Sequence, residues 1–521
     1  MSHKLGKRSI VKKTVEVGFS TFLSRVLGLA REALMARYLG AGVISDAFIT
    51  AFKIPNFLRK IFAEGALTAS FVPTIVGVFK KDSQDDASRL MTLAFIFFEG
   101  VLFALCMVIF VFAWYVIRFI APGFSLDQVE HAVPFLRILI GFILFVSSSA
   151  LLAGALNAVN HFFVPAFSPV VLNIFFVSGL VLGLVYGLPV TFLCYVILLG
   201  ALAQFLMHVY VYFKLKFTFL PINKKALSNF MTLMKRFVPC FMGMSVLELN
   251  LFVDTSLASF LEPGSLTRVY YASRFMGIPL GVFAIAFATI LLPHFSRVAH
   301  YAPKRLGFYL FEASKLIFWV TVPVSLVMSF FSYQIFSTLF VSKKFTIADA
   351  VSTQYILIAF TIGLFFFSIN KILINMFYAL HDTKQPTIIT ILATLLNVEL
   401  NIILMQLFSA TGLAIATTIG GIFQTALFYF YLRRIHKLPL FLPKLIPFIY
   451  RSVLQMVCIM PLFYLVYYAA EMMIMSLSLS MQYYLLETVV FWIWVVPIVG
   501  VLFGTLYLTR QLFGLKMYFV E

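Results

Sequence analysis

Two arginines and a glutamate interrupt the first long apolar segment, in the stretch Ser24-Arg25-Val-Leu-Gly-Leu-Ala-Arg31-Glu32. A charge at the centre of a membrane-spanning helix costs about 2.5–3.5 kcal/mol on insertion scales. Such residues therefore face a partner or a water-filled cavity rather than lipid. Guanidinium groups bind phosphate through two parallel hydrogen bonds. The stretch thus predicts a cationic cavity inside a membrane, suited to an anionic and phosphorylated substrate.

The spacing places these polar residues on one broad face of a helix. Positions seven apart nearly superimpose at about 100° per residue. Ser24 therefore shares one stripe with Arg31, and Arg25 shares the next with Glu32. Gly28 adds little bulk between the two arginines. A simpler role for Glu32 than acid or base chemistry is to pair with one of these arginines.

The next apolar segment carries more ionizable residues, namely Asp46, Lys53, Arg59, Lys60 and Glu64. Asp46, Lys53 and Lys60 are seven residues apart and are expected on one stripe. Pro55 is expected to kink this helix because it removes a backbone donor. Two alternatives stay open here: the residues from Arg59 onward bind lipid headgroups at the interface, and Asp46 lies at the outer surface.

Arginine recurs in a later apolar segment, in the stretch Arg268-Val-Tyr270-Tyr271-Ala-Ser273-Arg274. Arg268 is expected at the membrane interface. We expect Arg274 to lie deeper, inside the apolar region. A structural role for Arg274, as the partner of Glu32 or Glu248, is the alternative.

We predict that four arginines surround one cavity, namely Arg25, Arg31, Arg59 and Arg274.

A second group of polar residues could hold a hard cation, namely Asp254, Asn397, Asn401 and Thr417. Asn397 and Asn401 are four residues apart and share a helix face. Carboxylate, amide and hydroxyl oxygens suit sodium or a proton relay. Interhelical hydrogen bonding is the alternative for the same residues.

Composition identifies the fold class. The chain has 521 residues, of which 62% are hydrophobic and only 11% charged, and its mean hydropathy is +1.01. Runs of about 20 apolar residues recur along the whole length. We predict an all-α polytopic membrane protein with fourteen spans, at approximately 14–39, 44–72, 91–117, 133–157, 164–186, 189–214, 229–261, 267–296, 309–340, 350–379, 386–408, 411–435, 446–470 and 483–509.

The charge pattern indicates topology rather than nucleic-acid binding. The net charge is +19, and the basic residues cluster in alternate connecting segments. The positive-inside rule then places both termini in the cytoplasm. The basic N-terminus resembles a signal peptide, but the apolar segment that follows is too long, so we expect a retained first helix. The four cysteines show no metal or disulfide spacing.

An internal repeat recurs after about six spans. Ile54-Pro55 parallels Ile278-Pro279, and Pro73 parallels Pro293. An even number of spans implies a parallel repeat, and transporters commonly bind substrate between such halves. We therefore predict an N-lobe at 1–222, a C-lobe at 223–437 and two appended C-terminal spans at 438–521.

The sequence holds no nucleotide-binding, metalloprotease or nucleophile-elbow motif, so we predict a protein that is not an enzyme and has no bound cofactor. Energy would then come from membrane potential or from an ion or substrate gradient, with sodium or a proton as the coupling ion.

Several motifs occur in a fixed order, namely Ser24-Arg-Val-Leu-Gly-Leu-Ala-Arg31, Ser45-Asp-Ala-Phe48, Phe52-Lys-Ile-Pro-Asn-Phe-Leu-Arg59, Ile61-Phe-Ala-Glu-Gly-Ala66, Phe71-Val-Pro73 and Tyr271-Ala-Ser-Arg274. Together they closely resemble the MurJ (MviN) family of bacterial lipid II flippases, which belongs to the MOP transporter superfamily. The resemblance implies transport of lipid II, an undecaprenyl-diphosphate-linked disaccharide pentapeptide, to the outer leaflet for peptidoglycan synthesis.

The resemblance also implies roles for parts of the chain. Arginines matching the four named above line the central cavity of the family, and the two extra helices form a groove for the lipid tail. Asp254, Asn397, Asn401 and Thr417 look like the family's cation site. Family members commonly have Asp where Glu32 stands and often where Ser273 stands, and Asn401 replaces an acidic ligand, which weakens the case for ion coupling. Expected partners are lipid II, membrane lipids and the cell-wall synthesis machinery.

Three rival functions fit parts of the pattern. A flippase for another lipid-linked oligosaccharide matches the charge equally well. A cation antiporter of the same superfamily is disfavoured because several arginines would repel a cationic substrate. A membrane-embedded glycosyltransferase would need an outer carboxylate, for which Asp46 and Glu471 are weak candidates.

Overall fold

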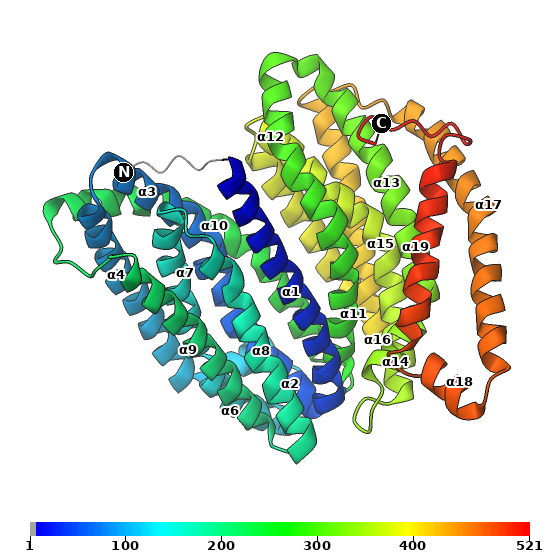
Figure 1. The fold of residues 1–521 in the computed structure, drawn as a ribbon, viewed down its shortest axis with the longest axis horizontal. Helices are drawn as coiled ribbons and strands as arrows, with labels where there is room; N and C mark the ends of the chain where they lie inside the picture. The colour runs from blue at the N-terminus through cyan, green and yellow to red at the C-terminus, as the bar shows by residue number, and fades with distance from the viewer. Residues whose placement is uncertain (1–6, 521) are drawn as a thin grey trace. The chain divides into compact units, whose positions relative to one another are not determined.

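The computed structural model describes residues 7–520, except for the side chains of residues 7–14, 64, 69, 243, 244, 246–251 and 442. Across this described part the regular secondary structure is entirely helical (Figure 1). The chain divides into two compact units, which meet at Thr267 and Arg268 in the sequence; residues 342–344 belong to the first unit. The all-α fold class is confirmed.

The first unit contains the helices α1 (Lys7–Leu39), α2 (Val43–Leu58), η1 (Arg59–Ala66), α3 (Leu67–Lys81), α4 (Gln84–Val111), α5 (Ala113–Ile120), α6 (Leu126–Leu139), α7 (Phe142–Ala158), α8 (Phe163–Tyr186), α9 (Val190–Lys214) and α10 (Lys224–Ala258). It therefore includes α10, whereas the sequence analysis ended the N-lobe at residue 222. The predicted lobe boundaries stay a prediction.

The second unit contains most of α11 (Ser265–Pro279), followed by η2 (Leu280–Ile285), α12 (Ala286–Tyr301), η3 (Pro303–Arg305), α13 (Leu306–Phe330), α14 (Ser332–Phe340), α15 (Ile347–Ala379), α16 (Lys384–Arg434), α17 (Leu442–Met475), α18 (Leu479–Leu486) and α19 (Phe491–Thr509). Helices α12, α13, α15 and α16 share one buried apolar cluster.

Ten helical segments in the described part of the chain are long and apolar enough to cross a membrane. The predicted spans 14–39, 44–72 and 229–261 are not among them. The first two carry the charged residues that drew attention in the sequence, and such residues lower the mean hydropathy of a helix. The total of fourteen spans stays a prediction.

The predicted eleventh and twelfth spans both lie in α16, a run of 51 residues that joins two helices across a kink. Ser409 interrupts its helical backbone with φ 51° and ψ −134°. This break falls between the predicted ranges 386–408 and 411–435. The two predicted spans are thus two helices separated by a kink.

Each unit contains a helix run in which a proline precedes a π-helical segment. Pro55 lies in α2 shortly before η1, and Pro279 ends α11 directly before η2. Pro73 and Pro293 then lie within α3 and α12, the helices that follow. These matched interruptions support the internal repeat read from the sequence. The kink expected at Pro55 takes the form of a π-helical segment beyond it.

Glycines allow the close approach of helices that positions α1. A Cβ atom added at Gly183 of α8 would lie 2.7 Å from the ring of Tyr38 on α1. One added at Gly200 of α9 would lie 2.7 Å from the Cβ of Phe175 on α8. Small residues at such crossings are typical of helices packed in membranes. Helix α8 is therefore held closely between α1 and α9.

A buried glutamine joins the two last long helices to α13. The side chain of Gln455 on α17 accepts a hydrogen bond from Trp319 Nε1 on α13 at 3.0 Å. Its amide nitrogen donates to Leu506 O and Thr509 Oγ1 of α19 at 2.7 and 2.9 Å. Figure 1 shows α17 and α19 as neighbouring helices. The appended spans are thus fixed to the second unit by apolar packing and by this polar link.

Candidate substrate-binding site

A polar network joins α1 to α8 within the first unit. Arg31 Nη1 donates to Asn173 Oδ1 at 3.0 Å, and Asn173 Nδ2 donates to both Ser24 O and Ser24 Oγ at 3.2 Å. Ser24 and Arg31 therefore contact the same side chain, which confirms that they share a stripe of α1. Asn173 is buried and holds this stripe against α8.

Glu32 and Arg25, the other two charged residues of the α1 stretch, differ in their surroundings. Arg31 Nη2 contacts Glu32 Oε1 at 2.7 Å, and the Glu32 carboxylate is almost entirely buried. This contact confirms the expected pairing of Glu32 with an arginine. The Arg31 guanidinium also lies 5.1 Å from the centre of the Phe176 ring. Arg31 is thus held in a fixed position by three neighbours.

Arg25 is exposed. Within the described part of the chain it makes no hydrogen bond or ion pair. Its guanidinium keeps all its donors for another molecule. The α1 stretch thus presents one arginine that is positioned by the protein and one that is available to a ligand.

Lys53 and Arg59 lie on the helix run that follows. Lys53 Nζ donates to Thr255 Oγ1 of α10 at 2.6 Å, and Arg59 Nε donates to Asn56 Oδ1 at 3.2 Å. Both side chains are partly buried. Arg59 and Lys60 begin the π-helical segment η1, and the side chain of Glu64 lies outside the described part of the structure.

Asp46, which we predicted to bind substrate, accepts several hydrogen bonds from within the first unit. Its carboxylate accepts hydrogen bonds from the backbone N–H of Gly264 at 2.6 Å and from the N–H and hydroxyl of Thr267 at 2.9 and 2.6 Å. Asp46 is 2% exposed. These contacts fit a structural carboxylate that anchors residues 264–267, and the position of Asp46 at the outer surface stays a prediction.

The arginines of the later stretch lie in the second unit. Arg274 is exposed and lies 4.7 Å from the centre of the Tyr270 ring. Arg268 lies 3.7 Å from Asp349. Arg25, Arg31 and Arg59 belong to the first unit, and the single cavity for all four arginines remains a prediction. The alternative partner Glu248 has a side chain outside the described part.

Three of the four predicted cation ligands come together in the second unit. Asn401 Nδ2 donates to Asn397 Oδ1 at 3.1 Å, and Asn397 Nδ2 lies 3.5 Å from Thr417 Oγ1. Asp254 belongs to the first unit. In the described part of the chain no group of three or more His, Cys, Asp or Glu residues has the geometry of a metal site. The three residues hydrogen-bond to one another within α16, and the cation site stays a prediction.

Two polar residues of this site were missed in the sequence. Asn173 and Thr255 are neutral residues within long apolar runs, and neither carries a charge that would draw attention. Their partners Arg31 and Lys53 were identified because of charge. A lone Asn within a predicted span was the available signal for Asn173, since buried amides in membranes seek hydrogen-bond partners.

The repeated all-helical units, with ionizable side chains on their helices, define a polytopic membrane transporter. The fold is similar to a solved inward-facing MATE multidrug transporter of the MOP superfamily, with a TM-score of 0.69, 15% identity and coverage of 81% of this chain and 97% of that one. At this identity the likeness shows the fold alone.

The chain belongs to the family of the lipid II flippase MurJ, whose family model matches residues 35–507. A probable lipid II flippase MurJ of Haemophilus influenzae is 33% identical over 431 residues, which cover 78% of this chain and 83% of the relative. A solved structure of the lipid II flippase MurJ in an inward closed conformation has a TM-score of 0.76 and 27% identity, covering 95% of this chain and 99% of that one.

Proposed function

We propose that this chain flips lipid II from the cytoplasmic to the outer leaflet of the bacterial inner membrane. The observation that carries this proposal is the family match over residues 35–507. Peptidoglycan synthesis outside the cell would use the flipped precursor. The chain acts as a transporter and not as an enzyme, its two termini lie in the cytoplasm, and its partners include the cell-wall synthesis machinery but no nucleic acid.

Arginines hold the substrate diphosphate in this proposal. A diphosphate carries several negative oxygens, which guanidinium groups bind through paired charge-assisted hydrogen bonds. The unpaired, exposed Arg25 and the positioned Arg31 support this assignment. Arg59 and Arg274 complete the set by their place in the repeat. Rocking of the repeated halves would then give alternating access.

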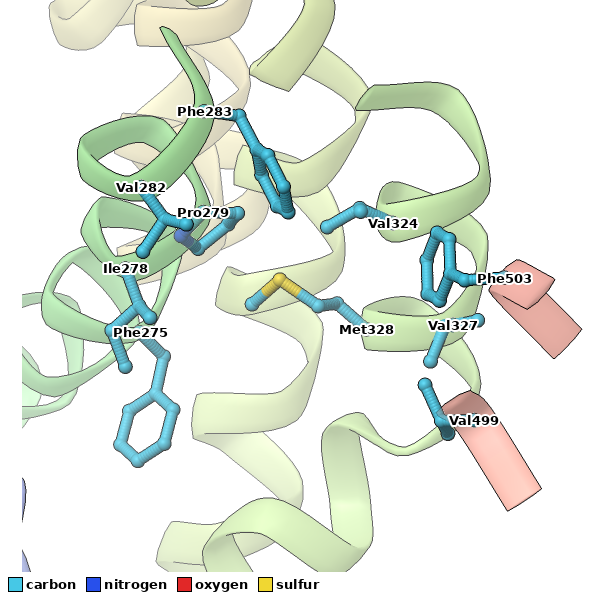
Figure 2. A pocket seen from close by; sticks show the side chains of 10 residues that line it. All are labelled: Phe275, Ile278, Pro279, Val282, Phe283, Val324, Val327, Met328, Val499 and Phe503. Carbon is cyan, nitrogen blue, oxygen red and sulfur yellow. The ribbon is translucent and has the colours of Figure 1, made fainter. Parts of the chain in front are cut away.

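An apolar pocket in the second unit suits the prenyl tail. It has a volume of about 300 Å³ and lies between α11 with η2, α13 and α19 (Figure 2). All ten lining residues are apolar, namely Phe275, Ile278, Pro279, Val282, Phe283, Val324, Val327, Met328, Val499 and Phe503. The last two belong to α19, the last predicted span. This placement supports the proposed role of the C-terminal helices in binding the lipid tail.

The energy source is a separate proposal. Sodium or proton coupling would require a cation-binding group, and the Asn397–Asn401–Thr417 cluster is the candidate from the sequence. Its internal hydrogen bonds favour a role in joining the two halves of α16. Flipping measured in vesicles with an imposed sodium gradient, proton gradient or membrane potential would identify the driving force.

Complementation of a bacterium depleted of its own lipid II flippase tests the function. We expect the wild type to restore growth, and Arg25→Ala, Arg31→Ala and Arg274→Ala to fail at equal membrane expression. Arg118→Ala is the matched control because this arginine is not one of the four predicted to line the cavity, and its guanidinium lies 6.0 Å from the centre of the Trp114 ring. Rescue by all three variants would contradict the arginine assignment. Failure of a well-inserted wild type would instead indicate another lipid-linked glycan.

A further inference from the structure

A second cavity lies in the first unit, among α4, α6, α7 and α9. Its volume is about 580 Å³. The side chains that line it are apolar except for Arg137 and Tyr195, and they are Phe103, Cys106, Met107, Phe110, Pro134, Arg137, Ile138, Ile140, Leu144, Tyr195 and Leu198 together with Gly141. None of the residues identified above in substrate binding lines it.

The break between α6 and α7 shapes this cavity. Helix α6 ends at Leu139 and α7 begins at Phe142. Gly141 lies at the break with ordinary helical φ and ψ of −63° and −20°. A Cβ atom added there would meet Leu198 at 3.5 Å, which is an ordinary contact. A larger side chain at 141 can therefore enter the cavity without straining the backbone.

The edges of the cavity are exposed and lie on helices that can cross a membrane. Phe103, Met107, Phe110 and Tyr195 are about half exposed along its edges, and they belong to helices that can cross a membrane. Water is a poor occupant because it would need two to four polar partners in such a space. Hydrocarbon suits the space better, since apolar surface gains by leaving water.

One cation at the edge of the cavity supplies selectivity. Arg137 Nε donates to Phe110 O at 3.3 Å, and its guanidinium lies 5.6 Å from the centre of the Phe110 ring. Arg137 is exposed, and within the described part of the chain its two terminal amino groups make no hydrogen bond. These contacts orient the guanidinium while leaving two parallel donors for a phosphate.

We propose that this cavity binds an anionic glycerophospholipid, with an acyl chain between α4, α6 and α9 and the phosphate on Arg137. The lining carries no carboxylate that would oppose the negative charge. The volume of about 580 Å³ lies within the range of pockets for drug-sized ligands, which suits an acyl chain. The single cation likewise matches a phosphodiester better than a diphosphate.

Lipid binding by the purified full chain tests this proposal. Nanodiscs of phosphatidylglycerol and of phosphatidylcholine would supply the lipid, and native mass spectrometry would count retained molecules. We expect the wild type to retain phosphatidylglycerol preferentially. Arg137→Gln should weaken this retention about tenfold, as expected for loss of one charge-assisted pair, while leaving phosphatidylcholine unaffected. Gly141→Leu should reduce retention of both lipids because the leucine side chain would occupy the part of the cavity that we propose for the acyl chain.

Two matched controls separate this site from general lipid contact. Arg118→Gln removes another arginine that contacts an aromatic ring and a backbone carbonyl, at Trp114 and Phe124, but does not line the cavity. Gly100→Leu adds bulk to an exposed position of α4 with open space around it. Both controls should retain lipid as the wild type does.

A photo-crosslinkable phosphatidylglycerol gives a second readout that does not depend on affinity. Labelled peptides should come from α4, α6 and α9, and labelling should fall in Gly141→Leu. Equal retention by wild type, Arg137→Gln and Gly141→Leu would overturn the proposal. Recovery of a polyprenyl diphosphate in place of the phospholipid would overturn it too.

Discussion

Asn173 uses both ends of its amide in the α1 network. Its oxygen accepts from Arg31, and its nitrogen donates to Ser24. A buried amide with both groups engaged fixes the orientation of its partners as well as their distance. The positioned guanidinium of Arg31 thus depends on a neutral residue more than 100 positions later in the chain.

Asn173→Ala should lower lipid II flipping about tenfold at unchanged membrane expression. The substitution removes the neighbour on α8 that hydrogen-bonds Arg31, which leaves the guanidinium to its contacts with Glu32 and Phe176, and a loss of about 1.4 kcal/mol corresponds to tenfold. Flipping assayed in vesicles checks this outcome. Ser178→Ala, at an exposed position of the same helix, is the control. Full activity of Asn173→Ala would show that Arg31 needs no support from α8.

Asp46→Ala should destabilise the protein rather than abolish substrate binding. Three donors from Gly264 and Thr267 would lose their acceptor, and each unpaired buried group costs about 1–3 kcal/mol. We expect a lower midpoint of thermal unfolding in detergent. Asp127→Ala, whose carboxylate is largely exposed, should leave the midpoint unchanged. An unaltered midpoint for Asp46→Ala would restore a direct functional role.

At the scale of helices, a few polar side chains form specific hydrogen bonds between otherwise apolar surfaces. Helices in a bilayer gain little from apolar burial against each other because lipid tails are equally apolar. The contacts of Gln455 with α13 and α19 therefore have a selective role. They determine which faces of the last helices meet the second unit.

Gln455→Leu should loosen α17 and α19 from α13. The indole N–H of Trp319 and the carbonyl of Leu506 would lose their partner in a buried region. Interhelical hydrogen bonds in membranes contribute about 0.6 kcal/mol on average, and up to about 1.7 kcal/mol, so the expected fall in the thermal midpoint is small but measurable. Gln511→Leu changes an exposed glutamine and serves for comparison. If both variants unfold alike, Gln455 does not join these helices.

At the scale of the whole molecule, the sequence predicts the fold class and the repeat because both depend on hydropathy and proline placement. The pairing of Ser24 with Arg31 on one stripe was also predictable, since helical period alone determines it. Asn173 was not, because nothing local shows which of many apolar helices faces α1. The role of Asp46 likewise depends on donors at residues 264–267, far away in the chain.

The predicted topology can be tested by cysteine accessibility. In a chain lacking its four natural cysteines, Glu262→Cys should react with a membrane-impermeant thiol reagent added to intact cells, and Lys304→Cys should react only after the membrane is opened. Both positions are exposed; Glu262 lies between α10 and α11, and Lys304 lies in the three-residue helix η3. The opposite pattern would reverse the predicted orientation of the chain.

The π-helical segment η1 changes the angular phase of the helix that contains it. Each π turn takes up one more residue than an α turn, so a spacing of seven residues no longer returns to the same side. Asp46 and Lys53 lie before this segment in α2, whereas Lys60 lies within it. The stripe that the sequence suggested for these three residues is therefore broken after Lys53. The side-chain faces of α2 and α3 are therefore rotated relative to each other about the helix axis by η1. The segment η2 introduces the same rotation between α11 and α12.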